Sequence, residues 1–293
     1  MPHGDKAITG VFSITDEPYE VKFVAALAGS EYATSGVAAT NDITVNFVAD
    51  LTLIDKYNKE CGTDYLPMPE GSYTFPASAI IGKGKGATDS LMLSVAAKDV
   101  FESFELYMLP IRISSVKGAG AYPYQQVLYI GLSGVEDADN ISLYDRSGWE
   151  VIEFSTEEPG EGGGNGLAQC ILDNNPSTFW HTQWAGSIPG PPHHFVVDMK
   201  ESVVVHGIAL MNRDFSGEWA TEGHGQPKNI KVAISADGEN WTDNGSFPNL
   251  QHPAGQPFIK YFFTSYKPAR YIKLTVTESY KEAYTCLAEF GVF

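Results

Sequence analysis

The sequence predicts an all-β protein built from two β-sandwich domains. The chain has 293 residues, and because domains commonly contain about 100–200 residues, two domains are expected. Its 29 Gly and 17 Pro favour turns, while its many Thr, Val, Ile, Tyr and Phe residues favour strands. Hydrophobic residues make up 43% of the chain, which is enough to form packed cores.

A short acidic and polar segment divides the chain. Residues Gly134–Asn140 lie between apolar stretches and have the composition of a linker. We therefore expect an N-terminal domain over residues 1–134 and a C-terminal domain over residues 141–293. A glycine-rich patch in the second domain, Glu157–Gly166, is interpreted as a surface loop.

In the first domain, alternation of apolar and polar residues predicts strands. Ile43, Val45 and Phe47 alternate with polar residues, which is the period of a half-buried strand. Several strands joined by turns indicate a sandwich of immunoglobulin-like character. Further strands are expected at Leu91–Val95, Phe104–Ile113 and Val127–Ile130.

One short helix is expected among these strands. Apolar residues recur at helical spacing from Leu51, and Asp50 before them is a candidate N-cap. Gly62 suits a C-terminal stop in the left-handed conformation. The predicted helix is therefore Leu51–Glu60.

The second domain is more clearly all-β, with no stretch of helical period. Asp237-Gly238 is a strong hairpin signal because this dipeptide favours a tight two-residue turn. We expect Trp180 and Trp241 to lie in the core. Strands are predicted at His194–Met199, Val203–Met211, Ile230–Ser235, Ile259–Phe263, Tyr271–Val276 and Leu287–Phe293.

The charge balance limits the classes of partner. There are 36 Asp and Glu residues against 19 Lys and Arg, giving a formal net charge of −17. Such a polyanion repels nucleic acid and anionic lipid, so we expect neither nucleic-acid binding nor membrane insertion of the domains. No apolar run reaches the roughly 20 residues that a membrane span needs. The classes of partner that the charge still allows are neutral ligands, cations and other proteins.

Catalysis has little support in the sequence. A glycoside hydrolase needs two carboxylates facing each other across a cleft, and no acidic pair lies in a recognisable motif. A Gly-x-Ser-x-Gly elbow and a His-Glu-x-x-His metal pair are both absent from the sequence. We therefore expect a binding protein rather than an enzyme, with a glycoside hydrolase role left open.

One turn has the composition of a calcium site. Calcium takes six to eight oxygen ligands, and Asp173, Asn175 and Thr178 lie close enough in the sequence to supply several of them. The alternative is a turn closed by its own side chains, which needs no metal. The residues alone leave both interpretations open.

Five motifs in one order resemble the discoidin, or coagulation-factor type C, family. They include an acidic turn followed by Thr and Trp, a Ser-x-Asp-Gly-x-x-Trp hairpin and an Ala-Arg-Tyr-Ile-Lys-Leu strand. Each is weak alone, but five in the family's order over about 120 residues are specific. They stand at Asp173–Trp184, Phe195–Met199, Ser235–Trp241, Ala269–Leu274 and Ala288–Phe290.

This resemblance implies a jelly-roll-like sandwich, galactose-binding-like, with a structural calcium ion near one end. Many relatives have Gly where this chain has Asn174, and Asp where it has Asn175. Asn tolerates the left-handed backbone, while the lost carboxylate should weaken the affinity for calcium. The implied ligands are Asp173, Asn175, Thr178, Glu289 and the carbonyls near Cys170 and Ala288.

The resemblance also implies sugar binding on loops at one end of the sandwich. Sugars need an aromatic face for their C–H groups and charged or amide groups for their hydroxyls. Arg213 is the leading candidate because aromatic residues flank it. The alternative is that Trp184 and Phe215 fill the core and Arg213 pairs with Asp214. The candidates are His181, Trp184, His193, Arg213, Asp214, Phe215, Trp219 and Tyr284.

Cysteines give no disulfide framework. Cys61, Cys170 and Cys286 match no zinc motif. Cys170 and Cys286 each precede an implied calcium ligand by three residues, so the two thiols could be neighbours. A disulfide and two separately buried thiols are both compatible with the sequence, and the buried thiols are favoured.

The first domain resembles the N-terminal module, of undefined function, of surface lipoproteins from glycan-foraging gut bacteria. The matching residues span about 8–132 and include Asp42–Val45, Tyr65–Pro69 and Tyr107–Ile111. This resemblance implies a lipid-anchored protein of the outer membrane and cell surface, whose signal and anchor cysteine lie outside this sequence. Other surface proteins of glycan uptake are its implied partners.

Taken together, these observations predict a non-catalytic cell-surface protein that binds a glycan through a calcium-stabilised module. A protein-docking or adhesion module is the first alternative, because discoidin-like domains elsewhere bind proteins. An accessory part of a glycoside hydrolase is the second.

Overall fold

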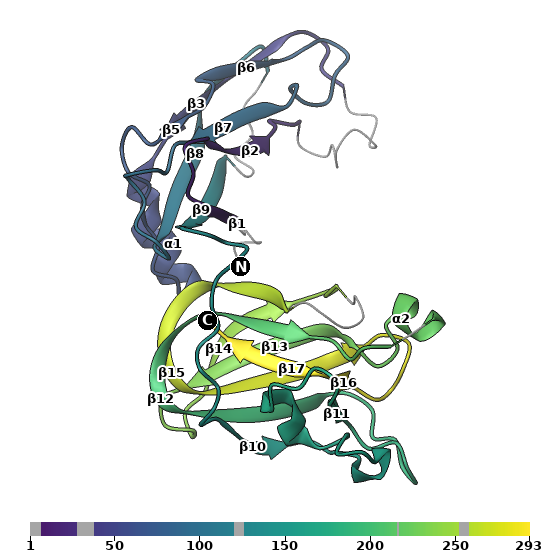
Figure 1. Cartoon of the computed structure of the whole chain (residues 1–293). Helices are drawn as coiled ribbons and strands as arrows, with labels where there is room; N and C mark the ends of the chain where they lie inside the picture. Colours follow the sequence, from purple (N-terminus) through teal and green to yellow (C-terminus); the bar gives the residue numbers. More distant parts are fainter. Residues whose placement is uncertain (1–6, 28–37, 120–125, 216, 252–257) are drawn as a thin grey trace. The chain divides into compact units, whose positions relative to one another are not determined.

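The computed structural model describes residues 7–27, 38–119, 126–215, 217–251 and 258–293. The chain forms two compact units, Met1–Asn140 and Ile141–Phe293, and each is described by itself (Figure 1). Both units are sheet-rich, as the sequence predicts. None of the helices in the described part of the chain is long and apolar enough to cross a membrane.

The first unit packs a larger sheet against a smaller one. The larger sheet runs β1 (Ile8–Ser13), β9 (Val127–Val135), β8 (Leu106–Lys117), β3 (Ile43–Ala49) and β6 (Ser78–Ile81), with β4 (Leu66–Pro67) beside β8. The smaller sheet runs β2 (Tyr19–Phe23), β7 (Leu91–Val95) and β5 (Tyr73–Thr74). Apolar residues of both sheets share one core. The strand β9 includes Gly134 and Val135, so the segment without strand pairing begins at Glu136, two residues later than expected.

The predicted helix is present, but its N-cap differs from the expectation. It starts as the 3₁₀ turn η1 (Leu51–Leu53) and continues as α1 (Ile54–Cys61), ending at Gly62 in the left-handed conformation. Asp50 makes no capping hydrogen bond. Its carboxylate instead accepts from the Thr52 hydroxyl and the Arg112 guanidinium, which compete with the backbone amides for its oxygens.

The second unit is dominated by one large sheet, ordered β10 (Glu150–Phe154), β12 (His193–Met211), β15 (Ile259–Ser279), β13 (Pro227–Ser235) and β14 (Thr242–Phe247). The last strand, β17 (Glu289–Val292), also pairs with β12. A small sheet joins β11 (Trp180–His181) to β16 (Cys286–Leu287). Three short helical segments lie in the connections: η2 (Pro159–Glu161), η3 (Ala168–Leu172) and α2 (Glu218–Glu222).

Two pairs of predicted strands are each one continuous strand. The stretches expected at 194–199 and 203–211 both belong to β12, and those at 259–263 and 271–276 both belong to β15. The pairing register between β12 and β15 shifts between Asp198 and Val203. The polar residues at this shift interrupt the alternation, which is why the sequence pattern divides there.

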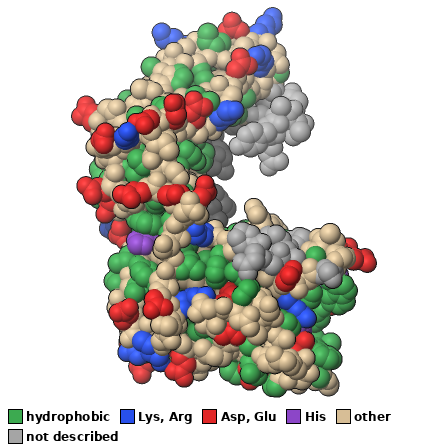
Figure 2. All heavy atoms as spheres, in the orientation of Figure 1, with side chains coloured by type: hydrophobic (Ala, Val, Ile, Leu, Met, Phe, Trp, Pro, Cys, Tyr) green, Lys and Arg blue, Asp and Glu red, His purple; other side chains and the backbone are tan. Residues whose placement is uncertain are grey.

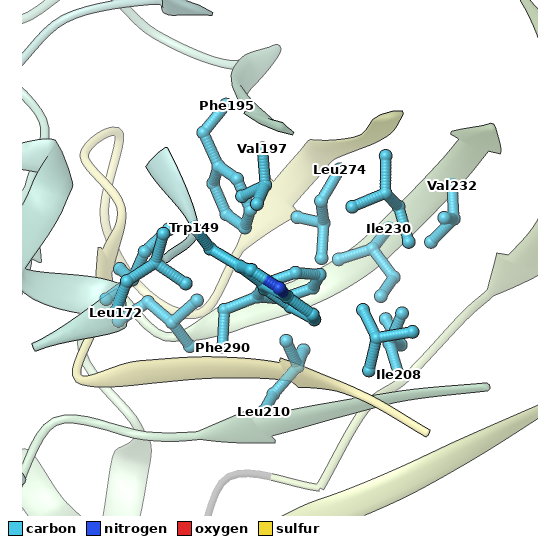
Figure 3. Packing of buried hydrophobic residues seen from close by; sticks show 14 of the residues in the cluster. Trp149, Leu172, Phe195, Val197, Ile208, Leu210, Ile230, Val232, Leu274 and Phe290 are labelled. Carbon is cyan, nitrogen blue, oxygen red and sulfur yellow. The ribbon is translucent and has the colours of Figure 1, made fainter. Parts of the chain in front are cut away.

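The core of the second unit gathers apolar side chains from nearly every strand (Figure 3). Trp180 is fully buried, as predicted, and packs edge-to-face on Phe195 with ring centroids 5.6 Å apart. Phe195 packs in the same way on Phe290, at 5.1 Å. Aromatic pairs in this geometry each add about 0.5–1.5 kcal/mol beyond the area they bury.

The expectation for Trp241 is wrong, because its side chain is 36% exposed. The residue follows the β13–β14 turn, where Gly238 has φ +82° and Asp237 accepts hydrogen bonds from the backbone amides of Glu239 and Asn240. Trp241 therefore lies at the end of the hairpin, beyond the paired part of β13 and β14.

A partly buried ion pair fixes the register shift of β12 to β15. The Arg270 guanidinium donates two hydrogen bonds of 2.9 Å to the two carboxylate oxygens of Asp198. Lys200 adds a backbone and a side-chain hydrogen bond to the same carboxylate. These bonds, that of Arg270 above all, hold the pKa of Asp198 well below its usual range.

We predict that Asp198→Asn lowers the free energy of unfolding at pH 7 by about 1–2 kcal/mol, since Arg270 is partly exposed and water screens the pair. Because the folded pKa is depressed, this stabilisation is present above about pH 4 and is lost as the pH falls below it. Urea unfolding at pH 7 and pH 3 measures both values. The exposed Asp243→Asn is the control, and an equal loss at both pH values would contradict the assignment.

Candidate functional site

Six side chains from four parts of the chain meet at one end of the second unit. Glu161 ends η2, His181 ends β11 and Trp184 follows it, Arg213 and Phe215 follow β12, and Tyr284 lies between β15 and β16. We call this set the loop cluster. Five of its members are among the predicted sugar-binding residues; Glu161 is not. The members are Glu161, His181, Trp184, Arg213, Phe215 and Tyr284.

Arg213 lies against two aromatic rings. Its guanidinium carbon is 3.6 Å from the centroid of the Phe179 ring and 4.5 Å from that of the Phe215 ring. In the described part of the chain no ion pair joins Arg213 to a carboxylate, so the alternative pairing with the exposed Asp214 is not formed. The backbone carbonyl of Arg213 accepts a 3.3 Å hydrogen bond from the fully buried side-chain amide of Gln226. The rings thus position a guanidinium that has no acidic partner.

Trp184 is held at the surface rather than in the core. Its side chain is 44% exposed, and its indole N–H donates a 2.8 Å hydrogen bond to Oε1 of Glu161. The backbone amides of Trp184 and Ala185 both donate to Oε2 of Glu158, whose Oε1 accepts from the Gly160 amide. Glu158 therefore anchors the Trp184 loop and the Glu161 turn together. These backbone hydrogen bonds lower the pKa of the Glu158 carboxyl.

His181 and Tyr284 pack against each other, with ring centroids 4.6 Å apart. His181 is almost fully buried, and its Nδ1 lies 2.6 Å from the Thr182 carbonyl oxygen. Gly225 makes room for the Tyr284 ring: at its φ of +72°, an added Cβ would lie 2.4 Å from Cε2 of Tyr284. Only glycine permits this close approach of backbone and ring.

The structure does not bring His193 into the loop cluster as a ligand-binding residue. Its side chain is 1% exposed, and its Nε2 donates a 2.9 Å hydrogen bond to the carbonyl oxygen of Ala283. His193 opens β12 inside the sheet, so its ring faces protein rather than solvent. It supports the loop that carries Tyr284.

Trp219 lies beside the loop cluster on α2. It is 48% exposed, and its ring centroid is 5.9 Å from that of Phe215 and 4.4 Å from that of His224. The two nitrogens of His224 contact Glu282 at 2.6 Å and Glu222 at 3.1 Å, which raises the pKa of His224. This network fixes one face of the exposed indole.

Burial sets the ionisation of the cluster's interior. It lowers the pKa of His181, so the ring is neutral at pH 7. It also raises the pKa of the Cys286 thiol to about 12, which makes this thiol a poor nucleophile. Cys170 and Cys286 are both buried free thiols, as the favoured interpretation had it. Acidic side chains lie in scattered groups on the visible face of both units, among hydrophobic and basic side chains (Figure 2).

Glu161 and Glu158 were missed by the sequence analysis. Both lie at the glycine-rich patch interpreted as a surface loop, which has no strand or helix period. Their partners, Trp184 and Ala185, are 23 to 27 residues away in the sequence. The acidic pair flanking Pro159 and Gly160 was the sequence signal that could have indicated this role. A carboxylate beside such a turn can accept hydrogen bonds from backbone amides.

The predicted calcium turn is closed by its own side chains. Asp173 accepts hydrogen bonds from the Asn175 amide at 2.8 Å and from the Thr178 hydroxyl at 2.6 Å. Asn174 adopts the left-handed conformation with φ +59°, as the resemblance implies. The turn thus has the internal hydrogen bonds that the metal-free interpretation expects. The side-chain oxygens of Asp173 and Thr178 remain close together.

Glu289 from β17 brings a second carboxylate toward this turn. Its Oε2 accepts a 2.7 Å hydrogen bond from the buried guanidinium of Arg146, which also donates to the carbonyl oxygens of Ile171 and Phe290. Its Oε1 is buried and has no hydrogen-bond partner in the described part of the chain. Burial raises the pKa of Glu289, and the negative charge of Asp173 adds to this shift.

The donor set around Glu289 fits a hard cation. An unsatisfied buried carboxylate oxygen is costly unless a cation or a donor approaches it. Within the described residues no three His, Cys, Asp or Glu side chains form a metal-binding group. The remaining donors are amide, hydroxyl and carbonyl oxygens, the ligands that calcium takes.

Comparisons with known proteins bear on both units. One family model, of an N-terminal domain, matches residues 3–120, and the F5/8 type C domain model matches residues 152–290. A galactose oxidase of Gibberella zeae is 32% identical over 154 residues, which are 52% of this chain and 21% of that protein. The chain thus spans about a fifth of the length of this relative.

Two solved structures each match about half of this chain. The C-terminal domain of a chitobiase from Bacteroides fragilis is 28% identical, with a TM-score of 0.46 over 52% of this chain and 97% of its own. A family 32 carbohydrate-binding module from Clostridium perfringens, solved with galactose, is 22% identical, with a TM-score of 0.42 over 52% and 97%. Residues 152–290 of this chain thus match the F5/8 type C, or discoidin, domain family.

Proposed function

We propose that the second unit is a non-catalytic carbohydrate-binding module whose ligand contacts the loop cluster. The observation that carries this proposal is Arg213, a guanidinium held against two aromatic rings without an acidic partner among the described residues. Its N–H groups can donate to adjacent sugar hydroxyls, because a planar fork matches two neighbouring oxygens. The exposed indole of Trp184 offers an apolar face for the C–H side of the ring.

The family and the composition support a sugar over other ligands. Residues 152–290 match the F5/8 type C domain model, and 154 residues of this chain are 32% identical to a galactose oxidase. The formal net charge of −17 disfavours nucleic acid and anionic membranes as partners. We expect modest affinity for a single sugar, because a small polar ligand buries little area.

We also propose a structural calcium ion held by Asp173, Asn175, Thr178 and Glu289, with the carbonyls near Cys170 and Ala288. The buried Oε1 of Glu289 without a partner supports this assignment. The ion would supply positive charge to two carboxylates and tie the last strand to the turn after η3.

For the whole protein we propose a lipid-anchored location at the outer membrane and cell surface, in a glycan-utilisation system. The match of the first unit to an N-terminal domain family supports this, given the resemblance to modules of surface lipoproteins. The first unit would then serve as a spacer or docking module, with other glycan-uptake proteins as partners.

We predict that Arg213→Ala weakens binding to the recognised glycan at least tenfold, because it removes all the charged donors of the loop cluster. A glycan and polysaccharide array selects the ligand, and titration calorimetry then gives Kd for the wild type and the variant. Arg213→Lys should restore only part of the affinity, since a point charge cannot form the fork.

Lys231→Ala, which removes an exposed cation on β13, is the matched control for charge and should bind like the wild type. Melting curves of all variants exclude unfolding as the cause of lost binding. Unchanged binding by a folded Arg213→Ala variant would overturn the site. Silence of the wild type across a broad array would favour the protein-docking alternative.

We predict that EDTA lowers the melting temperature and that added calcium restores it. A ligand at 100 times its Kd stabilises the folded state by about 2.7 kcal/mol, which corresponds to roughly 5–10 °C for a unit of this size. The Asp173→Asn variant should respond less to EDTA, while Asp243→Asn should respond like the wild type. A melting curve that EDTA leaves unchanged would contradict the calcium assignment.

A further inference from the structure

Glu161 is an acidic residue at the centre of the loop cluster. Its Oε1 accepts the Trp184 indole N–H at 2.8 Å and lies 3.8 Å from Nε2 of His181. Its side chain is 16% exposed, and no partner of its Oε2 is found in the described part of the chain. One oxygen of this carboxylate therefore fixes the indole, and the other is left to accept from a ligand.

His181 adds no positive charge beside Glu161. A carbonyl oxygen only accepts, so the 2.6 Å contact with Thr182 places the ring proton on Nδ1. Burial keeps the ring neutral, which leaves Nε2, the atom nearest Glu161, as an acceptor. The Glu161 side of the cluster therefore consists of acceptors.

Other charges do not offset this carboxylate. Glu158, the buried residue just before η2, is ionised and accepts hydrogen bonds from backbone amides. Arg213 is the one cation of the loop cluster, and Lys281 nearby is already paired with Glu222 at 3.2 Å. With two carboxylates, Glu158 and Glu161, and one guanidinium, Arg213, the charge of this region is net negative.

Sugar hydroxyls and carboxylates differ in the hydrogen bonds that they can form with Arg213 and Glu161. Sugar hydroxyls can both accept from Arg213 and donate to Glu161, whereas a carboxylate only accepts. A uronic acid would bring a like charge toward Glu161, and such juxtaposition is costly in a partly desolvated site. We propose that Glu161 makes the loop cluster selective for neutral sugars and excludes their uronic acids.

This inference rests on the proposed carbohydrate binding at the loop cluster, and it is tested with matched pairs. Galactose with galacturonic acid, glucose with glucuronic acid, and mannose with mannuronic acid differ at one carbon only. Titration calorimetry should find a neutral sugar bound and its uronic acid bound at least about tenfold more weakly. High salt should narrow this ratio, because it screens charge.

Glu161→Gln removes the charge but keeps an acceptor for the Trp184 indole, so the loop should stay folded. In this variant the ratio of the Kd of the uronic acid to the Kd of its neutral sugar should fall to about threefold or less. Glu239→Gln, which removes an exposed acid at the β13–β14 turn, should leave the ratio unchanged. Melting curves verify that each variant is folded.

Two results would overturn the inference alone: a uronic acid bound as tightly as its neutral partner, or a ratio that Glu161→Gln leaves unchanged. In both cases sugar binding itself stands. If neither member of any pair binds, and a polysaccharide array is also silent, carbohydrate binding fails and the selectivity fails with it.

Discussion

The buried guanidinium of Arg146 is the tie on which the second unit depends. It joins Glu289 on the last strand to the carbonyl of Ile171 in η3, and it bonds the Phe290 carbonyl as well. Removing one partner of such a pair typically costs about 3–5 kcal/mol, because the other charge is left buried. By holding η3 to β17, this tie also sets the position of the turn that begins at Asp173 and the start of β11 behind the loop cluster.

The loop cluster combines three kinds of contact that no single connection could supply. The guanidinium of Arg213 provides donors, Glu161 provides an acceptor, and Trp184 provides an apolar surface, and they come from three different loops. The sandwich brings the ends of its strands together, so residues far apart in the sequence become neighbours. The arrangement is rigid where it is buried and exposed where a ligand would approach.

Alternating residues were enough to predict the strands, because one face of each sheet is buried and the period of two is then enforced. The expectation that Trp241 is buried failed, because this residue lies at the end of a hairpin. His193 could not be told from a ligand-binding histidine, since only the fold shows that its ring meets the Ala283 carbonyl. Glu161 escaped notice because its role depends on a partner 23 residues away, and glycine-rich loops have no period from which contacts can be read.

Around the loop cluster, most residues that hold the loops are not those that would touch a ligand. Three buried residues form hydrogen bonds with backbone atoms: Glu158, His193 and Gln226. Trp184 and Arg213 instead lie at the tips of their loops. Substitution at a tip therefore leaves the supports intact, and a new preference can arise without a folding defect. Such a separation makes the scaffold adaptable: a lineage or a designer could change its ligand by a few replacements while the framework stays the same.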